Sequence, residues 1–153
     1  MTFRYCAESG VTLHDCDITE WVFAGDVTFV FEDGFDVFSD CPQNDTGRHK
    51  HTGRSAVVLK NGKFVSGEAS FGNTYYGAGE GFPDSECRPV SKEEMTELEL
   101  EVLDFKILPD SVFLECDAWK NNGEDAGFCE FEFSCEGVLF QWDEFTDDAW
   151  FQN

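Results

Sequence analysis

The sequence is poor in basic side chains. Its 153 residues include 10 Lys and Arg against 32 Asp and Glu, which gives a formal net charge of −22 at pH 7. Nucleic acids and anionic membrane surfaces are negatively charged and would repel such a chain. The composition therefore excludes unaided binding to either polyanion and favours a basic partner.

Long apolar runs are also missing. No stretch approaches the roughly 18 apolar residues of a membrane-spanning helix, and no basic segment followed by an apolar one stands at the start. The seven Cys are an odd number without closely spaced pairs, which is typical of free thiols in a reducing compartment. We therefore expect a soluble, unexported, cytoplasmic protein.

The chain is nevertheless rich enough in apolar residues to fold. Its hydrophobic content is 41%, with 17 Phe, and no linker or repeat divides it. We expect a single acidic β-rich domain over residues 1–153. Segments that alternate apolar and polar residues, separated by turn residues, predict a mostly β fold: an antiparallel β-sandwich or barrel of roughly nine to ten short strands.

Helices are expected at two places only. Ser91-Lys92-Glu93-Glu94 matches a capping box and predicts a short helix near 91–96. The tail at 143–151 would place Phe145, Ala149 and Trp150 on one side of a second short helix.

Two tight turns predict β-hairpins. Asp33-Gly34 stands between apolar segments, and Asn61-Gly62 separates 57–59 from 64–65. Asn-Gly accepts the positive φ angles of a type I′ turn, so each turn is expected to join two strands that pair with each other. Residues 40–54 lack apolar periodicity and predict a mobile surface loop, and the Gly-rich residues 71–89 predict another irregular segment.

Three segments of the C-terminal half alternate carboxylates with apolar residues. As strands, 97–102, 112–118 and 129–135 would place apolar side chains on one sheet face and carboxylates on the other. A bulge near Val102-Leu103 would extend the first strand. A helix through residue 103 is the alternative, but it would stack Glu residues at i,i+4 without a Lys between them. The carboxylates of these strands are Glu97, Glu99, Glu101, Glu115, Asp117, Glu130 and Glu132.

An ordered face of like charges costs stability. Each pair of like charges on neighbouring strands destabilises a sheet by less than about 1 kcal/mol. A surface that served only solubility would also include Lys. The acidity is also uneven, with 11 acids and 6 Lys or Arg in residues 1–76 against 21 and 4 in residues 77–153. This favours a binding face, while a solvated face screened by salt remains the alternative.

Candidate residues for metal binding or catalysis are few. The three His are His14, His49 and His51. His49 and His51 would form half a metal site on a strand, but a Gly-flanked polar segment favours solvent exposure. No Cys pair has zinc-site spacing and no Cys is marked as an activated nucleophile. A small metal-binding or hydrolytic domain using these His is the second hypothesis.

The leading hypothesis is a binding protein without enzyme activity. We expect an acidic inhibitor that occupies the basic nucleic-acid-binding site of a partner, either as an immunity protein against a nuclease-type toxin or as a DNA mimic with an anti-defence role. No cofactor, metal, direct nucleic acid contact or membrane contact is expected. An acidic structural or assembly subunit is a further alternative. The predicted partner-binding residues are the seven carboxylates above with Tyr75, Tyr76 and Trp119 as apolar anchors.

Overall fold

The computed structural model describes residues 3–5, 10–71 and 86–153. These residues form fifteen strands and one short helix, α1 (Lys92–Thr96), and the strands pair antiparallel in three sheets. The predicted mostly β, antiparallel, sandwich-like fold is therefore confirmed, with more strands than the nine or ten expected. The one helix described is five residues long, and none described is long and apolar enough to cross a membrane.

Each sheet draws its strands from distant parts of the chain. The five-stranded sheet has the order β1 (Phe3–Tyr5), β14 (Gly137–Trp142), β8 (Ser55–Lys60), β5 (Asp26–Phe31), β4 (Glu20–Ala24). The six-stranded sheet has the order β10 (Glu86–Pro89), β9 (Lys63–Phe71), β13 (Asp125–Ser134), β12 (Ser111–Trp119), β11 (Glu99–Ile107), β3 (Asp17–Ile18). The four-stranded sheet has the order β15 (Phe145–Asp148), β7 (Lys50–Thr52), β6 (Asp36–Val37), β2 (Val11–Thr12).

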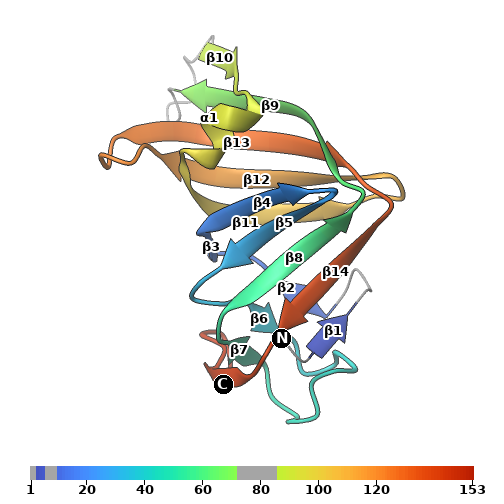
Figure 1. Cartoon of the computed structure of the whole chain (residues 1–153). Coiled ribbons are helices and arrows are strands. Elements are labelled where there is room, and N and C mark those ends of the chain that lie inside the picture. Colours follow the sequence, from blue (N-terminus) through green and yellow to red (C-terminus); the bar gives the residue numbers. More distant parts are fainter. Residues whose placement is uncertain (1–2, 6–9, 72–85) are drawn as a thin grey trace.

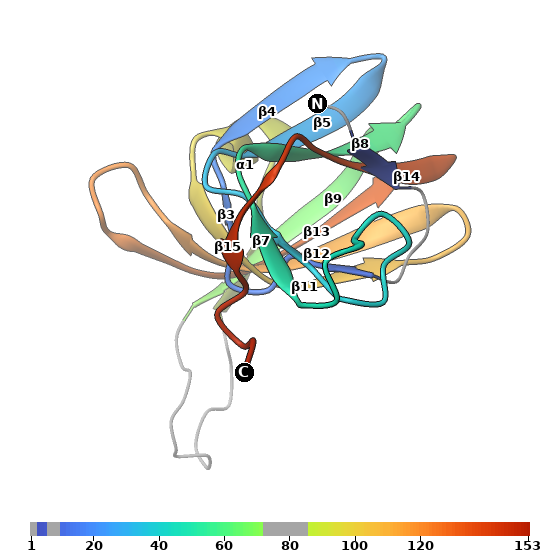
Figure 2. The same cartoon turned by 90° about the horizontal axis from the view of Figure 1, so that it is seen from below.

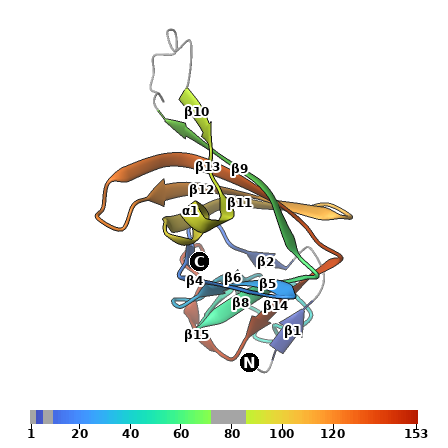
Figure 3. The ribbon, with the colours of Figure 1, turned by 45° about the horizontal axis from the view of Figure 1, so that its top comes forward.

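The two larger sheets face each other. Figures 2 and 3 show β4 and β5 in one layer and β12 and β13 in the other. Aromatic rings from both layers meet between them: Phe29 of β5 contacts Phe105 of β11, with ring centroids 5.9 Å apart, and Trp21 of β4 stacks on Phe133 of β13 at 5.7 Å. One face of the six-stranded sheet is therefore buried in this core and the other is left to solvent.

The chain changes sheets at two corners that lie side by side. β8 passes into β9, and β13 into β14, at the right of Figure 1, and the Glu136 N–H donates to the Lys60 carbonyl over 2.8 Å. The predicted Asn61-Gly62 hairpin is wrong, because the strands it joins belong to different sheets. Asn61 has a positive φ of 49° but Gly62 does not, and a Cβ on Gly62 would lie 2.9 Å from that of Leu59.

The predicted Asp33-Gly34 hairpin is also wrong. β5 and β6 lie in different sheets, and the hairpin in this region is β4–β5 across Gly25. Gly34 has a φ of +86°, and a Cβ there would stand 2.1 Å from the Thr52 carbonyl oxygen. This glycine therefore allows two backbone segments to cross closely, where the Phe35 N–H donates to the Thr52 hydroxyl over 3.0 Å.

The short helix predicted near 91–96 is confirmed, with its capping box at Ser91. Met95 is fully buried, and Lys92 of α1 lies over Phe23 of β4, with Nζ 4.4 Å from the ring centroid. The following strand begins later than predicted, at Glu99, because the last helical turn uses Glu97 as its C-cap. The predicted bulge is confirmed by a register shift between Val102 and Asp104.

The predicted helix at 143–151 is wrong. Residues 145–148 form β15, which pairs with β7, and a turn follows. The strand is held from the side by Asp148, whose carboxylate accepts bonds from Arg48 at 2.8 Å and Lys50 at 3.0 Å. The segment predicted as a mobile loop therefore contributes β7 and the cations that dock the tail.

Candidate functional site: an acidic sheet face

The three predicted acidic segments meet as neighbouring strands. β11, β12 and β13 are adjacent in the six-stranded sheet, with their apolar side chains in the core. Because paired residues on adjacent strands share a face, the register shows which carboxylates stand together on the solvent side. We call this set the acidic face: Asp17, Glu68, Glu99, Glu101, Asp104, Glu115, Asp117, Glu130 and Glu132.

Seven of these carboxylates form two rows across the strands. The first row is Asp104, Glu115, Glu130 and Glu68, on β11, β12, β13 and β9. The second row is Asp17, Glu101 and Asp117, on β3, β11 and β12. With neighbouring strands about 4.8 Å apart, the first row extends over about 14 Å.

Burial and neighbouring negative charges raise the pKa of two carboxylates of the face, Glu130 and Glu101. Partial burial raises the pKa of the Glu130 carboxyl, and the charge of Glu115 and a hydrogen bond with it raise the pKa further. Partial burial likewise raises the pKa of Glu101, and the charges of Asp17 and Asp15 add to the effect. The face thus favours any bound cation or proton that removes this repulsion.

The face has little internal compensation. Lys106 lies on it, with Nζ 3.5 Å from Glu115 and 3.9 Å from Asp104. In the part of the chain that the structure describes, the other seven carboxylates make no ion pair with Lys, Arg or His. Arg48 and Lys50 are instead paired with Asp148 in the four-stranded sheet. Among the cations that the structure describes, Lys106 alone forms ion pairs with the acidic face.

Aromatic side chains stand among the carboxylates. Phe128 is 39% exposed and pairs with Asp117, Phe113 pairs with Glu132, and Trp119 pairs with Glu99. Partly exposed aromatic rings within a charged surface are typical of protein interfaces, where they supply contact area that charge alone does not.

The structure brings together most of the residues predicted from sequence. Six of the seven carboxylates lie on the acidic face, with Trp119 at its end. Glu97 does not, since it is the C-cap of α1. Tyr75 and Tyr76 lie outside the described residues.

Three carboxylates of the face were missed by sequence reasoning. Asp104 follows the bulge, and the extra residue in the bulge turns the Asp104 side chain to the outer face of the sheet. Glu68 carried a weak signal, the alternation of Ser66, Glu68 and Ser70. Asp17 carried none, because its place depends on a two-residue strand at the sheet edge.

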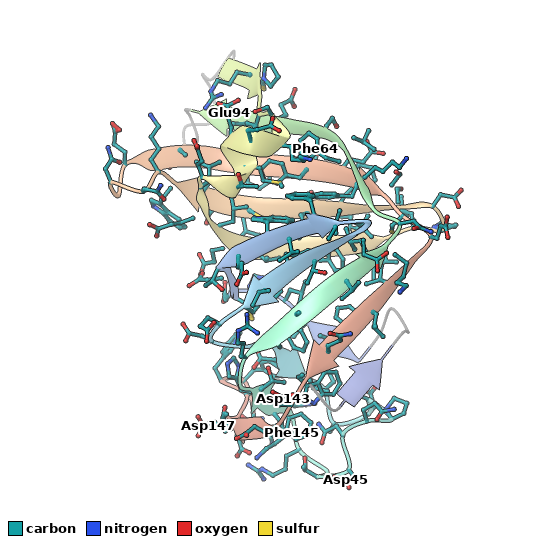
Figure 4. The ribbon with its side chains drawn as sticks, viewed as in Figure 1. Asp45, Phe64, Glu94, Asp143, Phe145 and Asp147 are labelled. Atoms are coloured by element: carbon teal, nitrogen blue, oxygen red, sulfur yellow. The ribbon has the colours of Figure 1, made fainter. Side chains whose placement is uncertain are left out.

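The acidic end of the chain is separate from this face. Figure 4 shows Asp143, Phe145 and Asp147 at the lower end of the molecule, whereas β12 and β13 cross the upper part. The acidic face therefore holds only part of the negative charge of the C-terminal half.

The three His occupy different environments. His14 Nδ1 lies 2.9 Å from the Leu103 carbonyl, and His49 Nδ1 accepts a bond from the Ser39 N–H over 3.0 Å. His51 Nδ1 lies 2.7 Å from the buried Asp36 carboxylate, and its Nε2 contacts the Asp33 carbonyl. Within the described ranges, no three His, Cys, Asp or Glu are grouped as a metal site.

The buried thiols are poorly suited to nucleophilic chemistry. Burial, together with the charge of Asp36, raises the pKa of Cys16 to about 12, and burial raises the pKa of Cys129 to about 11. The thiolate is the nucleophile, so these side chains remain in the unreactive form at neutral pH.

No protein-family model, curated protein or solved structure matches the chain. The fold and the site define a class, an all-β protein with a carboxylate-lined sheet face. A function has to be argued from that face.

Proposed function

We propose that this protein is an acidic inhibitor that binds a basic protein and occupies that partner's nucleic-acid-binding site. The observation that carries the proposal is the row of four carboxylates, Asp104, Glu115, Glu130 and Glu68, on four adjacent strands. Lys106 alone offsets this row by ion pairing in the described residues. A fold that keeps such repulsion has a surface ready for a cationic counterpart.

The charge density of the row supports mimicry of a phosphate backbone. A sheet places one carboxylate about every 4.8 Å across the strands, compared with one phosphate about every 3.4 Å of helix axis along one DNA strand. The backbone pairing of the sheet fixes the Cα positions of the row, so the backbone needs no ordering on binding. The net charge of −22 would also steer a basic partner and make association fast and salt-dependent.

Two biological settings fit this activity. An immunity protein would block a nuclease-type toxin in the cytoplasm that produces it, and a DNA mimic would block a DNA-handling or defence protein. Both require a soluble protein with a cytoplasmic location, and both exclude direct contact with nucleic acid.

The test is affinity capture from the source cells with a charge-reversed face. The variant Glu68→Lys, Glu115→Lys and Glu130→Lys reverses three neighbouring carboxylates of the first row. This variant also places three Lys side by side and removes the Glu115–Lys106 ion pair, so circular dichroism must first show that it folds. We expect the folded variant to lose a partner that the unmodified protein retains. Excess duplex DNA should release the same partner from the unmodified protein.

The matched control reverses three exposed acids outside the face: Asp45→Lys, Glu136→Lys and Glu144→Lys. It changes the net charge by the same amount and should retain the partner. Capture by the row variant would reject the site, and a partner that DNA cannot displace would reject the nucleic-acid site as its target.

A further inference from the structure

A pocket of about 400 Å³ opens at one end of the acidic face. Its lining includes Trp119, the acidic residues Asp17, Glu99 and Glu101, and the polar residues Thr96 and Asn121. Ile18 and Leu100, both buried, also line it. Its size falls within the range of small-ligand sites, so it has room for one long side chain.

The pocket exists because the edge strand is short. β3 has two residues and pairs only with Leu100 and Glu101 of β11. β12 continues past that point to Trp119, which pairs with Glu99. At this end the sheet therefore lacks an edge strand beside β11. The pocket lies in the space that such a strand would fill, between β3, α1 and the end of β12.

The residues that line the pocket favour a cationic ligand. It holds three acidic residues and no Lys, Arg or His. Partial burial raises the pKa of Asp17, and the charges of Asp33 and Glu99 raise it further. In the described chain no aromatic ring stacks on Trp119, and Trp is the aromatic side chain that binds cations best.

An arginine suits this lining better than a lysine. A guanidinium is planar, is more weakly hydrated than an ammonium, stacks on an aromatic ring and donates in a fixed fork to carboxylates. An ammonium is a compact, strongly hydrated point charge. Arginine is also enriched in protein interfaces, whereas lysine is depleted.

We propose that the pocket between β3, α1 and the end of β12 receives the guanidinium of one arginine side chain of the partner, stacked on Trp119 and paired with Glu99 and Glu101. This proposal rests on the proposed function, because the basic protein partner is the molecule that supplies the arginine. The pocket adds specific recognition of one arginine to the general attraction between the acidic face and a basic partner.

The experiment uses N-acetyl-arginine amide as the probe, with the lysine and citrulline amides as comparisons. The indole N–H resonance of Trp119, assigned with Trp119→Phe, reports binding to the full chain. We expect a saturable shift with the arginine probe, a several-fold weaker one with lysine and none with citrulline. Glu99→Gln or Glu101→Gln should weaken arginine binding about two- to fivefold, as loss of an exposed ion pair does.

Glu136→Gln is the matched control, because it removes one exposed carboxylate outside both the pocket and the acidic face. It should leave the arginine affinity unchanged. No saturable shift, equal binding of lysine or citrulline, or an equal loss in the control would overturn the proposal. Because the row variant used for capture leaves the pocket intact, failure of the pocket and failure of the proposed function give different results.

Discussion

Neutralising one carboxylate in the middle of the first row should stabilise the fold. Glu130 stands between Glu115 and Glu68 on the neighbouring strands. Two unit charges about 5 Å apart repel by about 0.8 kcal/mol in bulk water, and measured like-charge strand pairs cost a fraction of about 1 kcal/mol. With Lys106 offsetting part of this repulsion, we expect Glu130→Gln to raise the free energy of unfolding by about 1 kcal/mol at low salt.

The effect should depend on pH with a definite sign. The pKa of Glu130 is raised in the folded protein, so its protonation favours the fold. This contribution is fully present below the pKa of the unfolded chain and is lost as pH rises through the raised folded pKa. The advantage of Glu130→Gln over the unmodified protein should therefore be small in acid and grow toward neutral pH.

Urea unfolding at pH 7 in about 0.02 M and about 1 M salt measures the prediction, since screening shortens to about 3 Å at 1 M. Glu136→Gln, at an exposed corner outside the acidic face, controls for the general benefit of removing one negative charge. If Glu130→Gln gained no more than this control, or gained as much at 1 M salt, the repulsive row would be refuted.

Two further predictions concern the four-stranded sheet and its neighbours. Gly34→Ala should lower the free energy of unfolding by more than about 2 kcal/mol, because a positive φ is combined with a Cβ 2.1 Å from the Thr52 oxygen. Gly25→Ala has a similar φ of +84° but open space around the Cβ, so it should lower this free energy by only about 1–2 kcal/mol. Thermal or urea unfolding measures both. For His51, burial lowers the pKa but hydrogen bonds to Asp36 and to a backbone carbonyl outweigh this and raise it overall. Stability should then fall as pH rises through that raised pKa, above about 6.5, and His51→Gln should abolish this fall; an unchanged profile would contradict the paired imidazolium.

Local signals in the sequence were reliable where the physics is local. Alternation in 112–118 and 129–135 identified two strands and the face of each carboxylate, because the side-chain period of a strand follows from backbone geometry alone. The capping box at Ser91 located α1 for the same reason, since its hydrogen bonds span three residues.

The sequence did not show which strands pair with each other. Asn61-Gly62 and Asp33-Gly34 are turns, as their composition indicates, but a turn does not say whether the chain returns to the same sheet or crosses to the other. That choice depends on burying two apolar sheet faces against each other, which involves strands far apart in the chain. The tail shows the same effect, because β15 is extended by pairing with β7 and by the ion pairs of Asp148.

The sequence by itself determined that this is a strongly acidic, antiparallel β protein whose C-terminal strands each carry carboxylates on one side. Only the tertiary structure decided that those strands are neighbours, that Asp17, Glu68 and Asp104 join them in two rows, and that the short edge strand leaves a pocket beside Trp119. The reason is physical: which face a residue takes is set within a strand, whereas which charges stand side by side is set by register between strands that the chain visits far apart.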